Sequence, residues 1–77
     1  MKTVVYDGRE IKTNLGGNYP FCDGNDKKTM TMYIRDSIRE TDEEMFNRIA
    51  RYGYNRITFY HTTTAIRGIY HLIAFAK

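Results

Sequence analysis

Polar and apolar residues follow recognisable periods along most of the chain, and these periods predict where its strands and helix lie. Residues 3–13 have the pattern of a β-hairpin, because strand-like positions flank Asp7-Gly8, a dipeptide that readily adopts positive φ in a tight turn. Residues 14–28 contain Gly, Asn, Asp and Pro at short intervals and predict one long loop. A loop of this length in a small domain often carries function.

The segment 29–35 alternates between two kinds of side chain and predicts a half-buried strand. Its apolar side, which we expect to face the core, consists of Met30, Met32 and Ile34. Its opposite side, which we expect to face away from the core, consists of Thr29, Thr31, Tyr33 and Arg35.

A capping box that runs from Thr41 to Glu44 predicts the start of a helix. In such a box the Thr41 hydroxyl accepts a hydrogen bond from the Glu44 N–H, and the Glu44 carboxylate accepts one from the Thr41 N–H. The apolar stripe that follows ends at Gly53, which favours a left-handed helix terminus. We therefore expect a helix over residues 42–52 with an apolar face made of Met45, Phe46, Ile49, Ala50 and Tyr52.

Two further strands are predicted at about 55–63 and 66–76. The second is apolar or aromatic on both faces, which is typical of a central strand. The best match of their apolar sets pairs Phe59 with Ile73 on the helix-covered face, and the same register puts His61 opposite His71. A register shifted by one residue is the alternative, and it sets the face of Phe59 against Leu72 and Tyr70.

Together these elements predict a single α+β domain over residues 1–77, with an N-terminal hairpin (3–13), a long loop (14–28) and a β-α-β-β unit (29–77). The expected architecture is a mixed sheet of four to five strands with one α-helix packed on one face. The other face of the sheet is then open to solvent or to a partner.

The composition is that of a globular protein, since 42% of the 77 residues are hydrophobic and 27% are charged. The single cysteine, Cys22, excludes an internal disulfide and favours a reducing compartment. No apolar run approaches the roughly 18 residues of a membrane span, and the first residues reach a charge too early for a signal peptide. We therefore expect a soluble, cytoplasmic protein with no membrane partner.

The charge pattern bears on the kind of partner. The formal net charge is +3 and the isoelectric point is near 9.1, which favours attraction to polyanions. Acidic residues are interleaved with the basic ones, however, and no basic run is present. The modest surplus favours a protein partner over a nucleic acid.

The sheet face away from the helix is the main candidate site, because it is rich in Tyr and Arg, residue types that dominate many interfaces. A solvated face, on which Tyr and Thr serve only β-propensity, is the competing interpretation. The predicted contacts are Tyr33, Arg35, Arg56, Tyr60, Arg67 and Tyr70, with a second contact in the loop at Tyr19, Phe21, Lys27 and Lys28.

The pair His61 and His71 is the one constellation that resembles a catalytic site. Two imidazoles on adjacent strands could act as general base and general acid in metal-independent RNA cleavage, with Arg67 stabilising the developing charge. The alternative is that both histidines simply cap an apolar sheet face near a turn.

Neither a metal site nor a cofactor site is predicted. Cys22 and the two histidines lack the paired short spacings of zinc ligands. The acidic run at 23–26 lacks the spaced ligands of a calcium loop, and Gly16-Gly17 lacks the Gly-Lys-Ser/Thr continuation of a phosphate loop.

In its size, its lack of a catalytic motif and its compact α+β plan, the chain is similar in kind to the short proteins that phages encode to block host machinery, anti-CRISPR proteins among them. The resemblance extends to no sequence motif. It implies a non-catalytic binding protein that occludes or regulates a macromolecular partner. This partner is most simply another protein. The alternatives are a module that binds RNA or single-stranded nucleic acid through the same face, and a small ribonuclease. A homo-oligomer is compatible with all three.

Overall fold

The computed structural model describes residues 2–16, 29–35, 40–62, 67–69 and 71–77. The elements of these residues, in chain order, are the strands β1 (Lys2–Tyr6), β2 (Arg9–Thr13) and β3 (Thr31–Ile34), the helix α2 (Asp42–Ala50), and the strands β4 (Arg56–His61) and β5 (Leu72–Ala76). The predicted contacts that lie outside the described residues are Tyr19, Phe21, Lys27, Lys28 and Tyr70.

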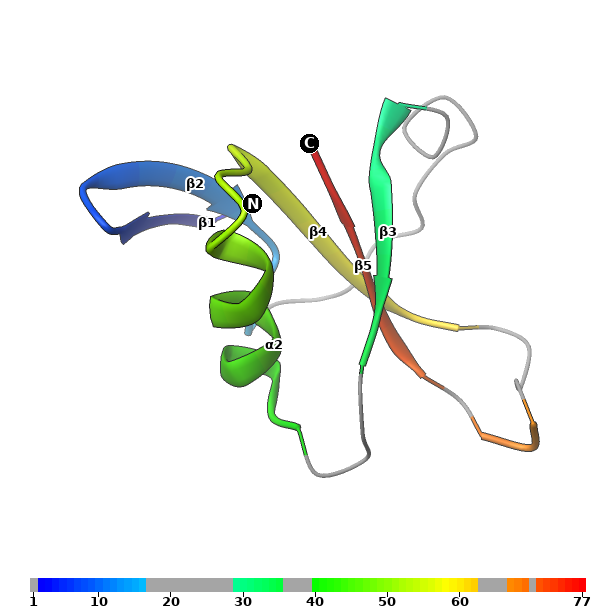
Figure 1. Ribbon diagram of the computed structural model, residues 1–77. Helices are drawn as coiled ribbons and strands as arrows, with labels where there is room; N and C mark the ends of the chain where they lie inside the picture. Colours follow the sequence, from blue (N-terminus) through cyan, green and yellow to red (C-terminus); the bar gives the residue numbers. More distant parts are fainter. Residues whose placement is uncertain (1, 17–28, 36–39, 63–66, 70) are drawn as a thin grey trace.

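The five described strands form one mixed sheet in the order β1-β2-β4-β5-β3. β2 and β4 are parallel, whereas the other neighbouring pairs are antiparallel. Because β3 and β4 both run antiparallel to β5, they are parallel to each other, and β5 lies between them. Figure 1 shows α2 beside this sheet, in the connection between β3 and β4. The predicted α+β plan is therefore confirmed for the described part of the chain.

The N-terminal hairpin forms as the turn dipeptide predicts. Asp7 and Gly8 both have positive φ, at 51° and 76°, which matches the right-handed twist of the two strands that they join. The hairpin joins the rest of the sheet through only two register pairs, Lys12 with Arg56 and Thr13 with Ile57. Its far half consequently projects beyond the sheet, as Figure 1 shows.

The helix begins where the capping box predicts, because the Thr41 Oγ1 accepts a hydrogen bond from the Glu44 N–H at 3.1 Å. The Glu44 carboxylate accepts from the Thr41 hydroxyl at 3.2 Å. The helix ends at Ala50, two residues earlier than predicted. The Gly53 N–H donates to the Ala50 carbonyl at 3.1 Å, so the last turn tightens before Gly53 takes a φ of 88° and reverses the chain.

The predicted register of β4 and β5 is wrong by one residue. β4 and β5 pair Phe59 with Ala74 and His61 with Leu72, rather than Phe59 with Ile73. The helix-covered face of β5 consequently carries Leu72, Ala74 and Ala76. The physical reason is side-chain volume. The prediction matched bulky residues across the two strands, whereas Ala74 opposite Phe59 and Ala76 opposite Ile57 leave room for the side chains of α2.

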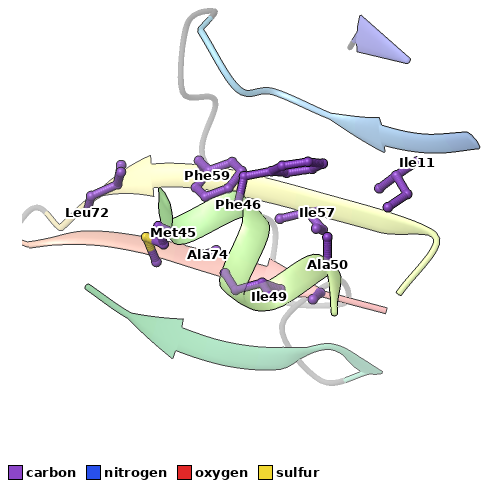
Figure 2. Close-up of a cluster of buried hydrophobic side chains, with 10 residues drawn as sticks. Ile11, Met45, Phe46, Ile49, Ala50, Ile57, Phe59, Leu72 and Ala74 are labelled. Atoms are coloured by element: carbon purple, nitrogen blue, oxygen red, sulfur yellow. The ribbon is translucent and has the colours of Figure 1, made fainter. Parts of the chain in front are cut away.

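The main core lies between α2 and the sheet, and Figure 2 shows the side chains of α2 directed at those of β4 and β5. β5 is buried along its whole length, which confirms the prediction of a central strand. The buried residues of this core are Ile11, Met45, Phe46, Ile49, Ala50, Ile57, Phe59, Leu72, Ala74 and Ala76.

A second, smaller cluster lies on the opposite face of the sheet. It consists of Tyr60, Ile73 and Phe75, which are only 8%, 6% and 5% exposed, and Met30 packs against it. The rings of Tyr60 and Phe75 stack, with centroids 5.3 Å apart and planes 5° apart. The part of this face where β4 and β5 meet is therefore buried, which corrects the expectation of an open face and of an outward Tyr60.

β3 presents the opposite faces from those predicted. Tyr33 is paired with Ala74 and packs against the main core, whereas Met32 is paired with Phe75 on the other face. Met32 and Ile34 are 53% and 37% exposed. β3 is shorter than the predicted strand over 29–35, since it runs from Thr31 to Ile34. Its side chains alternate as predicted, but alternation defines two faces without deciding which one meets the helix.

Candidate functional site

The five predicted sheet contacts that the structure describes do not share one surface. Tyr33 lies on the helix side of the sheet, and Arg35 forms an ion pair with Asp42 of α2. Arg56 and Tyr60 alternate with core residues of β4 and lie on the other side. Arg67 is in an exposed turn with a φ of 53°, away from the strand faces.

The two histidines do not form a pair. His61 alternates with Phe59 and lies on the helix side of β4. His71 continues the ladder beside Thr62: the Thr62 N–H donates to the His71 carbonyl at 2.9 Å, and the His71 N–H donates to the Thr62 hydroxyl at 2.9 Å. Because His71 alternates with Ile73 of the second cluster, its side chain lies on the opposite face from that of His61. The expected arrangement of the two imidazoles is therefore wrong, and the cause is the register.

Within the described ranges, no group of three or more His, Cys, Asp or Glu residues is placed to hold a metal ion. Across the same part of the chain, no helix has the length and apolar character that crossing a membrane requires.

The edge of the sheet at β3 is the strongest candidate site. β3 is the last strand in the sheet order, and no described strand pairs with its outer side, as Figure 1 shows. The Arg35 N–H donates to the Leu72 carbonyl at 3.2 Å, so the backbone of Arg35 points toward β5. In an antiparallel strand, successive residues point their backbone groups alternately to the two sides. The backbone groups of Met32 and Ile34 therefore point to the outer side.

Arg48 of α2 reaches this edge. Its Nη2 donates to the Ile34 carbonyl at 3.1 Å, and its Nε donates to Glu40 Oε1 at 2.9 Å. The Ile34 carbonyl is thereby satisfied at the end of the strand. β3 is short, and Arg48 already occupies one of its outward carbonyl groups. Both features reduce the number of backbone groups that an added strand could bind, and both are common protections of sheet edges.

Three tyrosines flank β3 on the helix side. Tyr33 and Tyr52 stack with ring centroids 6.0 Å apart, and Tyr54 lies edge-on to Tyr33 at 5.8 Å. The hydroxyls of Tyr33 and Tyr54 are 2.5 Å apart and share a hydrogen bond. That bond, followed by burial, raises the pKa of Tyr33 to about 12. Tyr52 is 66% exposed, so one side of its ring is accessible while the other packs on Tyr33.

We call these residues the β3-edge surface, which consists of Met32, Tyr33, Ile34, Tyr52 and Tyr54. Of these five residues, the sequence pattern predicts only Tyr33 as a contact residue. It predicts that Tyr52 belongs to the apolar face of the helix and that Met32 and Ile34 face the core. The available signal is Tyr52-Gly53-Tyr54, because a glycine that ends a helix reverses the chain. This reversal brings the ring centroids of Tyr52 and Tyr54 to 6.5 Å from each other.

Several basic side chains near the helix serve the fold. Arg9 donates through Nη2 to the Ala50 carbonyl at 2.8 Å and through Nη1 to the Tyr54 carbonyl at 3.3 Å. Arg35 pairs with Asp42, and Arg48 pairs with Glu40. These guanidinium groups are therefore engaged in holding α2 to the hairpin and to β3.

Comparison of the chain with models of protein families, with curated proteins and with solved structures found no match.

Proposed function

We propose that this chain is a small non-catalytic binding protein that receives an extended segment of a protein partner along β3, and thereby occludes or regulates that partner. The observation that carries the proposal is the outer side of β3. It combines the outward backbone groups of Met32 and the outward N–H of Ile34 with the exposed side chains of both residues on one face. The exposed ring of Tyr52 lies on the other face. Strand addition draws affinity from such backbone groups and specificity from the flanking side chains.

Two observations favour a protein over a nucleic acid as the partner. Two basic side chains beside the β3-edge surface, Arg35 and Arg48, are already paired with Asp42 and Glu40. The stacked rings of Tyr60 and Phe75, which would suit the stacking of bases, are almost fully buried. Nucleic-acid binding remains the second hypothesis, and ribonuclease activity is not favoured because the two histidines lie on opposite faces of the sheet.

A narrower proposal concerns the setting in which the protein acts. The size, the α+β plan and the single cysteine suit a cytoplasmic inhibitor of the kind that phages encode. Identification of the captured partner tests this proposal, since it requires that the partner be a component of host machinery.

The test is affinity capture with purified wild-type protein and matched variants, with and without nuclease treatment. Met32→Lys places a charge on the outer strand and should weaken binding at least tenfold, which corresponds to about 1.4 kcal/mol. Tyr52→Ala removes the exposed ring and should cost about 1–2 kcal/mol of binding free energy. Binding constants for the captured protein, measured by calorimetry, give both values.

Thr3→Lys is the matched control, because it places the same charge on β1, the strand at the other edge of the sheet. It should leave binding unchanged, and circular dichroism should report the same fold for all three variants. Wild-type affinity in Met32→Lys would contradict strand addition at β3. Loss of the captured protein after nuclease treatment would favour the nucleic-acid hypothesis.

A further inference from the structure

A groove lies at the other end of the sheet from β3, between β1 and the first turns of α2. It has a volume of about 340 Å³. Apolar side chains form most of its lining, and Glu43 stands among them; the lining residues that matter here are Val4, Val5, Tyr6, Leu15, Phe46 and Glu43.

The aromatic part of this groove is well ordered by packing. The rings of Tyr6 and Phe46 meet edge to face, with centroids 6.0 Å apart and planes at 90°. Phe46 is buried in the main core, whereas Val5 is 69% exposed. The groove therefore has a packed aromatic side and an exposed side at Val5 that is open to an incoming chain.

The acidic residues in the first turn of α2 differ in their contacts. Asp42 forms an ion pair with Arg35, and Glu44 accepts from the Thr41 hydroxyl. Glu43 is exposed and makes no ion pair or hydrogen bond with any described residue. Its carboxylate is thus the one charged group of the groove lining, and it has no described counter-charge.

We infer that this groove binds an aliphatic chain that ends in a cation, the chemistry of a lysine side chain of a partner protein. The apolar walls match the methylene groups, and the Glu43 carboxylate matches the ammonium group. A neutral apolar chain would leave that carboxylate without a counter-charge, and an anionic chain would be repelled by it. The residues are separate from the β3-edge surface, so this site is independent of the proposed strand addition.

The experiment uses hexylammonium as the probe, with hexanol and hexanoate as matched ligands of the same chain length. Amide NMR of the full-length protein follows each titration. Hexylammonium should shift the signals of Val5, Tyr6 and Phe46, and it should bind about two- to fivefold more tightly than hexanol at low salt. Hexanoate should bind least. The preference for hexylammonium should shrink in high salt, because the charge pair is exposed.

Glu43→Gln should remove the preference for hexylammonium over hexanol while the binding of hexanol stays the same. Glu44→Gln is the matched control, since it removes a neighbouring carboxylate that does not line the groove, and it should keep most of the preference. Equal affinities of the three ligands for the wild type, or shifts that cluster away from β1 and α2, would overturn the inference. An equal loss of preference in both variants would also overturn it, because the effect would then come from overall charge.

Discussion

At the scale of single residues, hydrogen bonding and burial change the pKa of Tyr33. Its hydroxyl shares a hydrogen bond with Tyr54, and this bond and burial raise its pKa from the ordinary 10.0 to about 12. The raised pKa means that folding favours the neutral form. This contribution to stability is fully present below about pH 10, and it is lost as the pH rises toward about 12.

We predict that Tyr54→Phe brings the pKa of Tyr33 down toward 10.0, because the largest cause of its rise is removed. Tyrosine-ring NMR during a base titration measures the midpoint. Tyr52→Phe is the control: it keeps the stacked ring and the hydrogen bond between Tyr33 and Tyr54, so it should change the midpoint less. An unchanged midpoint in Tyr54→Phe would show that the hydroxyl contact is absent in solution.

The residue type of an arginine does not show whether its side chain contacts a partner or stabilises the fold. Arg35 was predicted as a contact for a partner, but its guanidinium pairs with Asp42 at the start of α2. The sequence holds no signal for this pairing, since the two residues lie seven positions apart and belong to different elements. An arginine binds whichever acceptors the fold brings within reach, and these become known only when the elements are packed.

At the scale of the elements, the N-terminal hairpin is held partly by a contact outside the sheet. Only two register pairs join it to β4, whereas Arg9 ties it to the end of α2 through the Ala50 and Tyr54 carbonyls. The Ala50 carbonyl, which also accepts from the Gly53 N–H, thereby gains a second and charged donor. The guanidinium also complements the negative end of the helix dipole.

We predict that Arg9→Met destabilises the protein by about 1.5 kcal/mol, because two charge-assisted hydrogen bonds are lost while much of the aliphatic stem remains. Urea unfolding gives the free energy, and hydrogen exchange should show faster exchange in β1 and β2 before the other strands. Lys12→Met is the control, since Lys12 is an exposed cation of the same strand. The anchoring role is refuted if both variants are equally stable.

At the scale of the whole molecule, the sheet has buried side chains on both faces. The main core lies under α2, and Tyr60, Ile73 and Phe75 form the cluster on the other face. Tyr60, expected from its position to contact a partner, is therefore a packing residue. Its substitution by alanine would test the fold rather than an interface.

We predict that Tyr60→Ala lowers the free energy of unfolding by about 3 kcal/mol, because it removes a buried ring that stacks on Phe75. That loss is large beside the roughly 5–15 kcal/mol that stabilise a typical domain. Tyr60→Phe keeps the ring and should retain most of the stability. Chemical denaturation measures all three proteins. If Tyr60→Ala unfolds like the wild type, the ring is not part of a packed cluster in solution, and its earlier interpretation as a contact residue regains support.

The amino-acid sequence by itself determined the local features of the protein. Asp7-Gly8 specifies the hairpin turn, and Thr41 to Glu44 specify the start of α2. Alternation indicates the two strands that follow, although β5 runs from Leu72 to Ala76 and is shorter than the predicted 66–76. These features depend on backbone preferences and on hydrogen bonds between residues close in the chain, so a single sequence contains them. The α+β plan follows from their order.

The tertiary structure alone decided the register, the orientation of β3 and the place of the site. A shift of one residue between β4 and β5 turned Ile73 and Phe75 away from the helix and separated the two histidines. Such a shift changes the local conformational energy of the strands little, because every strand keeps its alternation of side chains. What selects it is the fit of volumes between α2 and the sheet, where Ala74 and Ala76 make room for the helix, and that fit exists only when all the elements are assembled.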